Sequence, residues 1–543
     1  MSSPSYFYRE YDVPLGIICI QKIQRFCFPR VTFNRELCYR TSVLVLTYLA
    51  YMCYHMTRKS ISVVKGVLNQ NCSSLTPPSV ISPDEMNTWC DWAPFDANNA
   101  QALLGTLDSA FLFAYAIAMF MSGFVAERVN LRYFLSLGML FSGIFSYLFG
   151  IAKSYNIHSL SYFIIVQIFA GIFQTTGWPG VVTVVGNWFG EGKRGLIYGI
   201  WNSHTSIGNI VGTLIAADYV ESDWALSFMV PGLIMGIFGF ILFLFLVVNP
   251  TDVYCASPRS KHGTQQHNGS RKMENKIANY GSSDDISSQT DDVVIDTEAL
   301  IDQTDVLQRR YSERTPILRQ LPIPTNNQQK AIGFVGALKI PGVIEYSLCL
   351  FFAKLVSYTF LYWLPLYIEF SSKMSAVNSA HLSTMFDVGG IAGAIIAGVV
   401  SDYSGMSATT CAGMLFAAVP MMFVYNSEGS SSSFALNILI LTVVGLLVNG
   451  PYGLITTSVS AQLGTHSCLE GNAKALATVT AIIDGTGSIG AAIGPLLAGF
   501  VSNSNKDWQN VFYMLMISDI LALLLLVRLV KREFLQLRPN HIE

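Results

Sequence analysis

Residues 48–59 read Tyr-Leu-Ala-Tyr-Met-Cys-Tyr-His-Met-Thr-Arg-Lys and place two cations inside an apolar run. The run extends from about Ser42 to Leu68, which is long enough for a helix to cross the roughly 30 Å hydrocarbon core of a bilayer. A charged side chain at the centre of such a helix costs about 2.5–3.5 kcal/mol on insertion scales. Arg58 and Lys59 therefore need an anionic partner, a wet cavity or both.

The side chains that precede these cations predict a polar cavity. On a helix, Tyr54 and His55 lie one turn before Arg58. Tyr51 lies one further turn back on the same face. The alternative is that Arg58 and Lys59 lie near the helix end and extend their charges to the membrane surface. The apolar sequence continues for about two turns beyond Lys59, which favours the cavity.

The composition indicates a polytopic membrane protein rather than a soluble enzyme. The chain has 543 residues, of which 51% are hydrophobic and 13% charged. A net charge of −2 gives no sign of a nucleic-acid partner. The first apolar patch, residues 15–20, is too short for a signal peptide, so we expect the first long helix to direct insertion. No metal, nucleotide or nucleophile motif stands out, and we expect no cofactor and no enzyme activity.

Apolar stretches of membrane-spanning length form two groups on either side of a polar segment. They lie near residues 42–68, 100–126, 131–152, 160–185, 195–220 and 224–248, and then near 344–370, 380–401, 408–425, 434–460, 475–500 and 511–530. The composition of residues 249–340 predicts a disordered cytosolic linker. We expect an all-α polytopic membrane protein whose twelve transmembrane helices form two six-helix bundles, 41–248 and 341–530, with an N-terminal arm (1–40) and a tail (531–543).

Two internal repeats predict that the bundles are pseudo-symmetric. The stretch Ser206-Ile-Gly-Asn-Ile-Val-Gly-Thr-Leu-Ile-Ala216 recurs as Ser488-Ile-Gly-Ala-Ala-Ile-Gly-Pro-Leu-Leu-Ala498, at an offset of 488 − 206 = 282. Gly123-Phe-Val-Ala-Glu-Arg128 recurs as Gly398-Val-Val-Ser-Asp402, where no Arg follows the acid, at an offset of 398 − 123 = 275. Both repeats fall at equivalent spans of the two halves, which indicates an internal duplication.

The distribution of charge predicts the topology. Residues 1–40 hold six Lys and Arg residues, so the positive-inside rule places both termini and the linker in the cytosol. The loop after the first span then faces a lumen or the cell exterior. It contains the sequon Asn71-Cys-Ser73, which predicts glycosylation of Asn71. An oxidising compartment would also allow Cys72 and Cys90 to pair.

Several longer motifs carry a family resemblance. Tyr54-His-Met-Thr-Arg-Lys59, Asn187-Trp-Phe-Gly-Glu-Gly-Lys-Arg-Gly195 and Trp201-Asn202 resemble the organophosphate:phosphate antiporter branch of the major facilitator superfamily. Trp92-Ala-Pro-Phe-Asp96, Gln174-Thr-Thr-Gly-Trp-Pro179, Trp201-Asn-Ser-His-Thr205 and Lys354-Leu-Val-Ser-Tyr-Thr-Phe-Leu-Tyr-Trp-Leu-Pro365 resemble solute carrier family 37, the sugar-phosphate exchangers. The likeness extends from about Arg40 to Val530.

The resemblance implies a major facilitator fold and a function. Members of the family exchange glucose 6-phosphate for inorganic phosphate across an internal membrane, usually the endoplasmic reticulum. Sugar phosphate, phosphate and membrane lipid are therefore the expected partners. Glu313-Arg-Thr-Pro-Ile-Leu318 is similar to an acidic dileucine sorting signal, which leaves an endolysosomal membrane as the alternative.

The resemblance also implies a phosphate-binding residue, Arg58. A guanidinium donates parallel hydrogen bonds to two oxygens of a phosphate. The second arginine of the antiporter branch falls on Ser357 here, and Lys354, one turn earlier, is the candidate substitute. The histidine that the branch carries in its fifth span aligns with Thr205, whereas this chain has His204.

The remaining candidate residues have more than one interpretation. Lys59, Tyr51, Tyr54, His55 and His204 complete the predicted polar site, and Trp201, Asn202, Tyr358 and Tyr362 either contact a sugar or are structural. Three carboxylates lie within predicted spans: Asp108, Asp387 and Asp484. They pair with Lys354 or Arg58 when the site is empty, bind protons for symport, or cap backbone groups. The competing functions are a proton-coupled organic-anion transporter and a non-transporting receptor or scaffold. The sequence does not identify the preferred sugar phosphate or the oligomeric state.

Overall fold

Two sets of long helices dominate the structure. The computed structural model describes residues 12–27, 34–69, 90–97, 99–126, 128–189, 200–256, 334–428, 433–464, 474–505 and 508–537. The first half contains α2 (Arg35–Leu68), α3 (Ala100–Ala126), α4 (Leu131–Ser154), α5 (Leu160–Gln174), α6 (Gly177–Phe189), α8 (His204–Val220) and α9 (Leu226–Phe245). The described residues contain no strand, as the sequence predicts.

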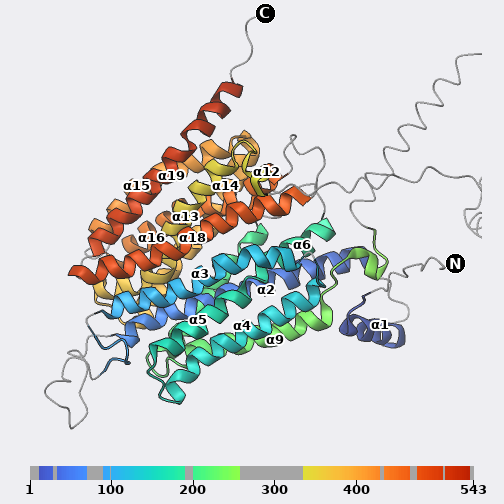
Figure 1. Ribbon diagram of the computed structural model, residues 1–543, viewed down its shortest axis with the longest axis horizontal. Helices are drawn as coiled ribbons and strands as arrows, with labels where there is room; N and C mark the ends of the chain where they lie inside the picture. Colours follow the sequence, from blue (N-terminus) through green and yellow to red (C-terminus); the bar gives the residue numbers. More distant parts are fainter. Residues whose placement is uncertain are drawn as a thin grey trace, which may run out of the picture. The chain divides into compact units, whose positions relative to one another are not determined.

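The second half repeats this arrangement (Figure 1). It contains α13 (Val343–Ser372), α14 (Ala376–Ser404), α15 (Ser407–Glu428), α16 (Phe434–Leu454), the π-helical turn η4 (Ile455–Val459), α17 (Ser460–Gly464), α18 (Lys474–Asn505) and α19 (Trp508–Leu537). Three short elements lie outside the bundles: α1 (Leu15–Cys27), the 3₁₀ turn η3 (Pro250–Val253) and α12 (Phe334–Leu338).

Ten helical segments in the described part of the chain are long and apolar enough to cross a membrane. The two predicted spans that fall outside this set are α2 and α8. Arg58, Lys59 and Lys65 lower the hydropathy of α2, and α8 has 17 residues. The count of twelve spans therefore stays a prediction, and the two exceptions are helices that supply polar side chains to the interior.

The internal repeat has a direct structural counterpart in glycine packing. A Cβ atom on Gly208 or Gly212 of α8 would lie 2.4 Å from a backbone carbonyl oxygen of α2, that of Met52 or Met56. The equivalent glycines of α18, Gly490 and Gly494, would place a Cβ 2.0 and 2.5 Å from the carbonyl oxygens of Phe351 and Leu355 in α13. Each half thus uses the same glycine pair to bring two helices into backbone contact, which only glycine permits.

This packing defines the register between the first helices of the two halves. Met56 corresponds to Leu355, an offset of 355 − 56 = 299. The same offset relates Arg58 to Ser357 and His55 to Lys354. The guanidinium of the first half therefore has a hydroxyl at its symmetry position in the second half.

One sequence-based boundary was wrong, and two predicted spans are interrupted. Helix α2 begins at Arg35 rather than near Ser42, because the side chain of Asn34 caps it by accepting a hydrogen bond from the backbone of Leu37 at 3.1 Å. The fourth span is two helices, α5 and α6, that meet at Thr175 and Thr176 just before Pro179. The tenth span contains the π-helical turn η4 shortly after Pro451.

The predicted linker is also shorter than its expected limits. Residues 250–253 form η3, in which Val253 is buried, and residues 334–338 form α12, in which Ala337 is buried. The indole of Trp188 donates to the carbonyl of Val247 at 2.9 Å and fixes the chain where it leaves α9. The two edges of the segment are folded because they bury apolar side chains against the bundles. Residues 257–333 lie outside the described part.

Candidate functional site

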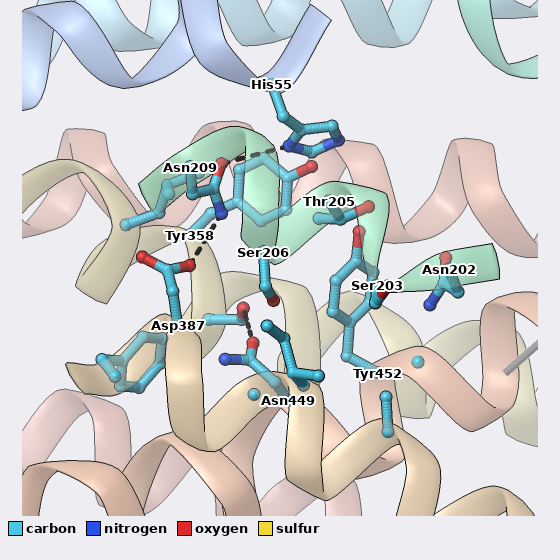
Figure 2. Close-up of a pocket in the computed structure, with 17 residues that line it drawn as sticks. His55, Asn202, Ser203, Thr205, Ser206, Asn209, Tyr358, Asp387, Asn449 and Tyr452 are labelled. Carbon is cyan, nitrogen blue, oxygen red and sulfur yellow. Dashed lines mark hydrogen bonds between the residues drawn. The ribbon is translucent and has the colours of Figure 1, made fainter. Parts of the chain in front are cut away.

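A cavity between the two halves is lined mainly by polar side chains (Figure 2). The first half contributes His55 from α2 and a polar stretch at the start of α8 that includes Asn202, Thr205 and Asn209. The second half contributes Ser357, Tyr358, Asp387, Asn449 and Tyr452. Hydroxyls, amides and tyrosines are groups that recognise a polyhydroxylated ligand.

Asn209 connects the two walls of this cavity. Its Nδ2 donates to Oδ1 of Asp387 at 2.8 Å, and its Oδ1 lies 3.3 Å from Nδ1 of His55. Figure 2 shows the amide between the imidazole and the carboxylate. On the other side, Ser357 donates to Oδ1 of Asn449 at 2.6 Å. The cavity walls are therefore already hydrogen-bonded to each other.

The cavity volume, about 30 Å³, is small for a metabolite. A cavity needs roughly 10–15 Å³ by this measure to hold one water molecule. The cavity as it stands therefore has room for water-sized groups rather than for a whole sugar phosphate.

Arg58 is buried without an acidic partner among the described residues. Arg58 is 4% exposed and lies ten residues before the end of α2 at Leu68, and Lys59, one residue later, is 1% exposed. The helix-end alternative is therefore wrong for both cations. Nε of Arg58 donates to Oε1 of Gln174 at 2.5 Å, while Nη2 has no hydrogen-bond partner. The guanidinium carbon lies 4.6 Å from the ring centre of Tyr115.

A second, smaller cavity lies beside Arg58, mostly within the first half, with Tyr362 of α13 at its border. Gln167, Gln174 and Ser142 contribute polar groups to its lining, and its volume is about 20 Å³. The Ser142 hydroxyl is also buried without a partner. This space is large enough for one water molecule, to which Nη2 of Arg58 and the hydroxyl of Ser142 would both hydrogen-bond.

Lys354 of α13 and Asp484 of α18 form an ion pair within the second half. Nζ of Lys354 lies 2.6 Å from Oδ1 of Asp484 and 3.5 Å from Oγ of Ser488. The ammonium also lies 5.5 Å from the ring centre of Tyr452, which lines the cavity. Tyr452 thus connects the Lys354 ammonium to the cavity edge.

The carboxylate of Asp108 pairs with Lys65, a residue that the sequence analysis did not single out. The two side chains are 0% exposed and form a short salt bridge. Nζ of Lys65 also donates to the carbonyl of Tyr362 at 3.0 Å and lies 3.8 Å from the ring centre of Trp363. Lys65 thereby joins α2 and α3 of the first half to α13 of the second. The signal for it was a third cation, seven residues after Arg58, in the same apolar run.

The other predicted site residues occupy different surroundings. Lys59 donates to the carbonyl of Leu361 at 2.8 Å, and Tyr54 shares a hydrogen bond of 2.8 Å with Thr176. Tyr51 and Trp201 pack against His204, at ring-centre distances of 4.6 and 4.4 Å.

Thr205, rather than His204, lines the inter-half cavity. The one-residue shift between these positions rotates the side chain by about 100° on a helix, which carries His204 into the aromatic core. The described lining of this cavity also lacks Arg58, Lys59 and Lys354 as well as Tyr51, Tyr54, Trp201 and Tyr362. Arg58 and Tyr362 border the second cavity instead.

The luminal-loop predictions fall largely outside the described residues. Asn71 and Cys72 lie outside the described residues, so glycosylation of Asn71 stays a prediction. Cys90 is disulfide-bonded, and its partner is not among the described residues. Within the described ranges, no cluster of three His, Cys, Asp or Glu side chains could hold a metal ion.

Comparisons with known proteins extend these observations. The Major Facilitator Superfamily profile matches residues 47–467. The chain is 55% identical to "Glucose-6-phosphate exchanger SLC37A2" of Bos taurus, over 92% of this chain and 95% of that protein. It is 53% identical to the Homo sapiens protein of the same name, over 93% and 94%. It is 49% identical to "Glucose-6-phosphate exchanger SLC37A1" of Mus musculus, over 93% and 95%.

Solved structures share the fold at low sequence identity. A D-xylose-proton symporter has a TM-score of 0.56 at 11% identity, covering 91% of this chain and 98% of that one. A bacterial homolog of the human lysosomal transporter Spinster, inward-facing and unoccupied, has a TM-score of 0.54 at 15% identity, covering 93% and 99%. These likenesses concern the arrangement of helices alone.

Proposed function

The chain belongs to the major facilitator superfamily and, within it, to solute carrier family 37, and on that premise we propose that it exchanges glucose 6-phosphate for inorganic phosphate by alternating access. The curated relatives that match over more than nine-tenths of this chain are glucose-6-phosphate exchangers by name. A membrane exchanger needs a site that reaches each side in turn. The candidate for that site is the cavity between the two halves, extended to Arg58 beside the second cavity and to Lys354 beside Tyr452.

The observation that carries this proposal is the uncompensated guanidinium of Arg58. A buried cation without an acidic neighbour is costly unless an anion occupies the site for part of the cycle. Gln174 and Tyr115 orient the guanidinium but leave its charge unneutralised. A phosphate group supplies the missing charge and accepts parallel hydrogen bonds. A scaffold that never binds an anion has no such compensation for Arg58.

Lys354 supplies the second cation in this mechanism. Asp484 pairs with Lys354 in the structure. We infer that phosphate competes with Asp484 for the ammonium, so that substrate occupancy breaks a contact within the second half and favours its movement. Ser357, at the symmetry position of Arg58, has no charge to add, which leaves Lys354 as a point charge rather than a bidentate clamp.

Exchange in proteoliposomes tests the proposal. Vesicles containing the full-length protein and preloaded with glucose 6-phosphate should take up labelled phosphate, whereas empty vesicles should not. Arg58→Met should abolish the uptake, and Arg528→Met, at an exposed arginine of α19, is the matched control that should retain it. Uptake by the Arg58→Met protein at the wild-type rate and affinity would refute the role of Arg58.

A proton-coupled organic-anion transporter is the second candidate, because Asp387 lines the cavity with one oxygen unpartnered. Its Oδ1 accepts from Asn209, whereas Oδ2 is buried without a hydrogen bond. Protonation of that oxygen would relieve the unpaired acceptor. An imposed pH gradient distinguishes the two functions. It should drive net uptake into empty vesicles only if protons are coupled.

We also propose the membrane address and orientation from the charge distribution. Both termini and the segment between the halves face the cytosol, and the membrane is that of the endoplasmic reticulum, with an endolysosomal membrane as the alternative. Endoglycosidase treatment of the native protein tests this topology. Loss of mass on treatment, abolished by Asn71→Gln, supports the orientation, and protease protection of the segment between the halves in intact vesicles contradicts it.

A further inference from the structure

Helix α1 carries an exposed apolar face that the transport mechanism does not use. Leu15, Ile20, Ile23 and Phe26 are 61%, 50%, 58% and 89% exposed, and Cys19 and Cys27 are also exposed. At 100° per residue, these six side chains fall within an arc of about 140°. The polar side chains of the helix lie on the remaining arc and are Gln21, Lys22, Gln24 and Arg25.

The helix is held against one end of the first half. Gly16 and Ile17 are buried, and a Cβ atom on Gly16 would lie 2.4 Å from Cε1 of Phe245 and 2.6 Å from the carbonyl oxygen of Leu244. Gln21 donates to the hydroxyl of Tyr39 at 2.9 Å, near the start of α2. The apolar face is therefore presented from a fixed position rather than from a free arm.

The residues just before α1 strengthen this attachment. The carboxylate of Asp12 lies 2.5 Å from Nη2 of Arg132, at the start of α4, and also contacts Asn130. Arg132 is buried, whereas the Asp12 side chain is 40% exposed, so the ion pair lies at the edge of the bundle. The attachment thus involves the ends of α2, α4 and α9 on one side of the bundle.

The position of α1 selects lipid as the occupant of its apolar face. The helix packs on the last residues of α9, whose side chains Leu233, Ile237 and Phe240 are 58%, 55% and 61% exposed along a membrane-spanning segment. A helix attached at the end of such a segment lies at the level of the lipid headgroups. An apolar face with Lys22 at its edge and Arg25 on the opposite arc is the pattern of a helix lying in the membrane surface, where the basic groups meet anionic headgroups.

We propose that α1 lies in the plane of the membrane, in the leaflet that meets the Arg35 end of α2, with its apolar face at the boundary between headgroups and acyl chains. The interaction is with bilayer lipid rather than with a second copy or another protein. It fixes the depth of the first half in the membrane from outside the bundle. It requires no substrate, so it is independent of the exchange mechanism.

One native thiol and one engineered thiol, on opposite arcs of α1, provide the test. An environment-sensitive fluorophore is attached to Cys19 in a Cys27→Ser, Cys38→Ser protein, or to the new thiol of an Arg25→Cys protein in which Cys19, Cys27 and Cys38 are Ser. Both full-length proteins are reconstituted in phosphatidylcholine–phosphatidylserine vesicles with or without brominated acyl chains. The protein with all three exposed cysteines replaced by Ser corrects for labelling elsewhere.

The proposal predicts that brominated lipid quenches the Cys19 probe several-fold more strongly than the Arg25→Cys probe. Equal quenching at the two positions, or no quenching at either, overturns it. Phe26→Asp should reduce quenching of the Cys19 probe, because an aspartate on the apolar face opposes insertion. A Cys19 probe that is shielded from lipid and cross-links to a second copy of the chain would identify a protein interface instead and would also overturn the proposal.

Discussion

Arg58 and Lys65 are buried cations on the same helix, seven residues apart, and their surroundings differ. Lys65 has a carboxylate, a backbone carbonyl and an aromatic face around its ammonium. Arg58 has an amide and an aromatic ring, and its Nη2 is unpartnered. Among the described residues, the charge of Lys65 is therefore compensated within the protein and that of Arg58 is not. Lys65 belongs to the joint between the halves, and we propose that Arg58 binds the transported anion.

The largest expected effect is a loss of protein stability when the acidic partner of Lys65 is removed. Asp108→Ala leaves Lys65 charged, unpaired and fully buried, and breaking such a pair costs about 3–5 kcal/mol. We expect a lower melting temperature and a lower yield of folded protein. The double variant Lys65→Met, Asp108→Leu should recover much of the loss, because neither charge remains. Thermal unfolding in detergent measures both.

A matched surface variant distinguishes this effect from a general loss of an acid. Asp402 is exposed at the end of α14, so Asp402→Ala should melt with the wild-type protein. If Asp108→Ala melts at the same temperature as Asp402→Ala, Lys65 is solvated in solution and the proposed joint between α2, α3 and α13 is wrong.

Removal of Arg58 should have the opposite effect on protein stability. Arg58→Met removes a buried charge and leaves no acid behind, so the melting temperature should be maintained or raised while exchange is lost. Arg58→Lys keeps the charge but removes the planar fork. It should weaken phosphate binding by about 1–3 kcal/mol, which corresponds to roughly 5- to 150-fold in affinity. Phosphate titration of exchange rates gives the affinity, and a melting curve checks the fold. A strong loss of stability in Arg58→Met would place Arg58 in the same class as Lys65.

The sequence analysis singled out Arg58 as a buried cation but not Lys65. Hydropathy and the glycine repeat located the helices, since both depend on local composition. The partner of a buried charge depends on contacts between distant residues, such as Lys65 with Asp108, 43 positions away. Sequence reasoning placed three acids in spans but could not match each to its cation. It also assigned Trp201 and His204 to the site, because it cannot distinguish a polar aromatic in the core from one at a cavity.

Lys354 occupies an intermediate position, since its carboxylate partner is near the cavity. The Asp484 side chain is 11% exposed, so water can partly solvate it when Lys354 is removed. Lys354→Ala should therefore lower the melting temperature by less than Asp108→Ala does, and should also weaken exchange. Lys354→Arg should retain both properties, because it preserves the charge. An Lys354→Ala protein that exchanges normally would exclude Lys354 as a phosphate ligand, whatever its stability.

A substitution at Gln174 can give Arg58 a carboxylate partner like that of Lys65. Its expected effect on phosphate affinity is the smallest of those described. Its Oε1 accepts from Arg58 at 2.5 Å while its Nε2 donates to Thr57 at 3.0 Å, so the amide orients the guanidinium without neutralising it. Gln174→Glu places a carboxylate at that position and gives Arg58 the kind of partner that Lys65 already has. Phosphate must then compete with an internal anion, so its apparent affinity should fall.

Gln174→Leu is the matched variant, because it removes the acceptor without adding charge. It should reduce affinity only a few-fold, through a less ordered guanidinium, and should bind phosphate better than Gln174→Glu does. The order of the two variants decides between a positioning role and a simple packing role for Gln174. Equal affinities in the two would mean that charge at this position does not reach the bound phosphate. Arg58 would then be neutralised by some other means, and its contrast with Lys65 would no longer identify the ligand.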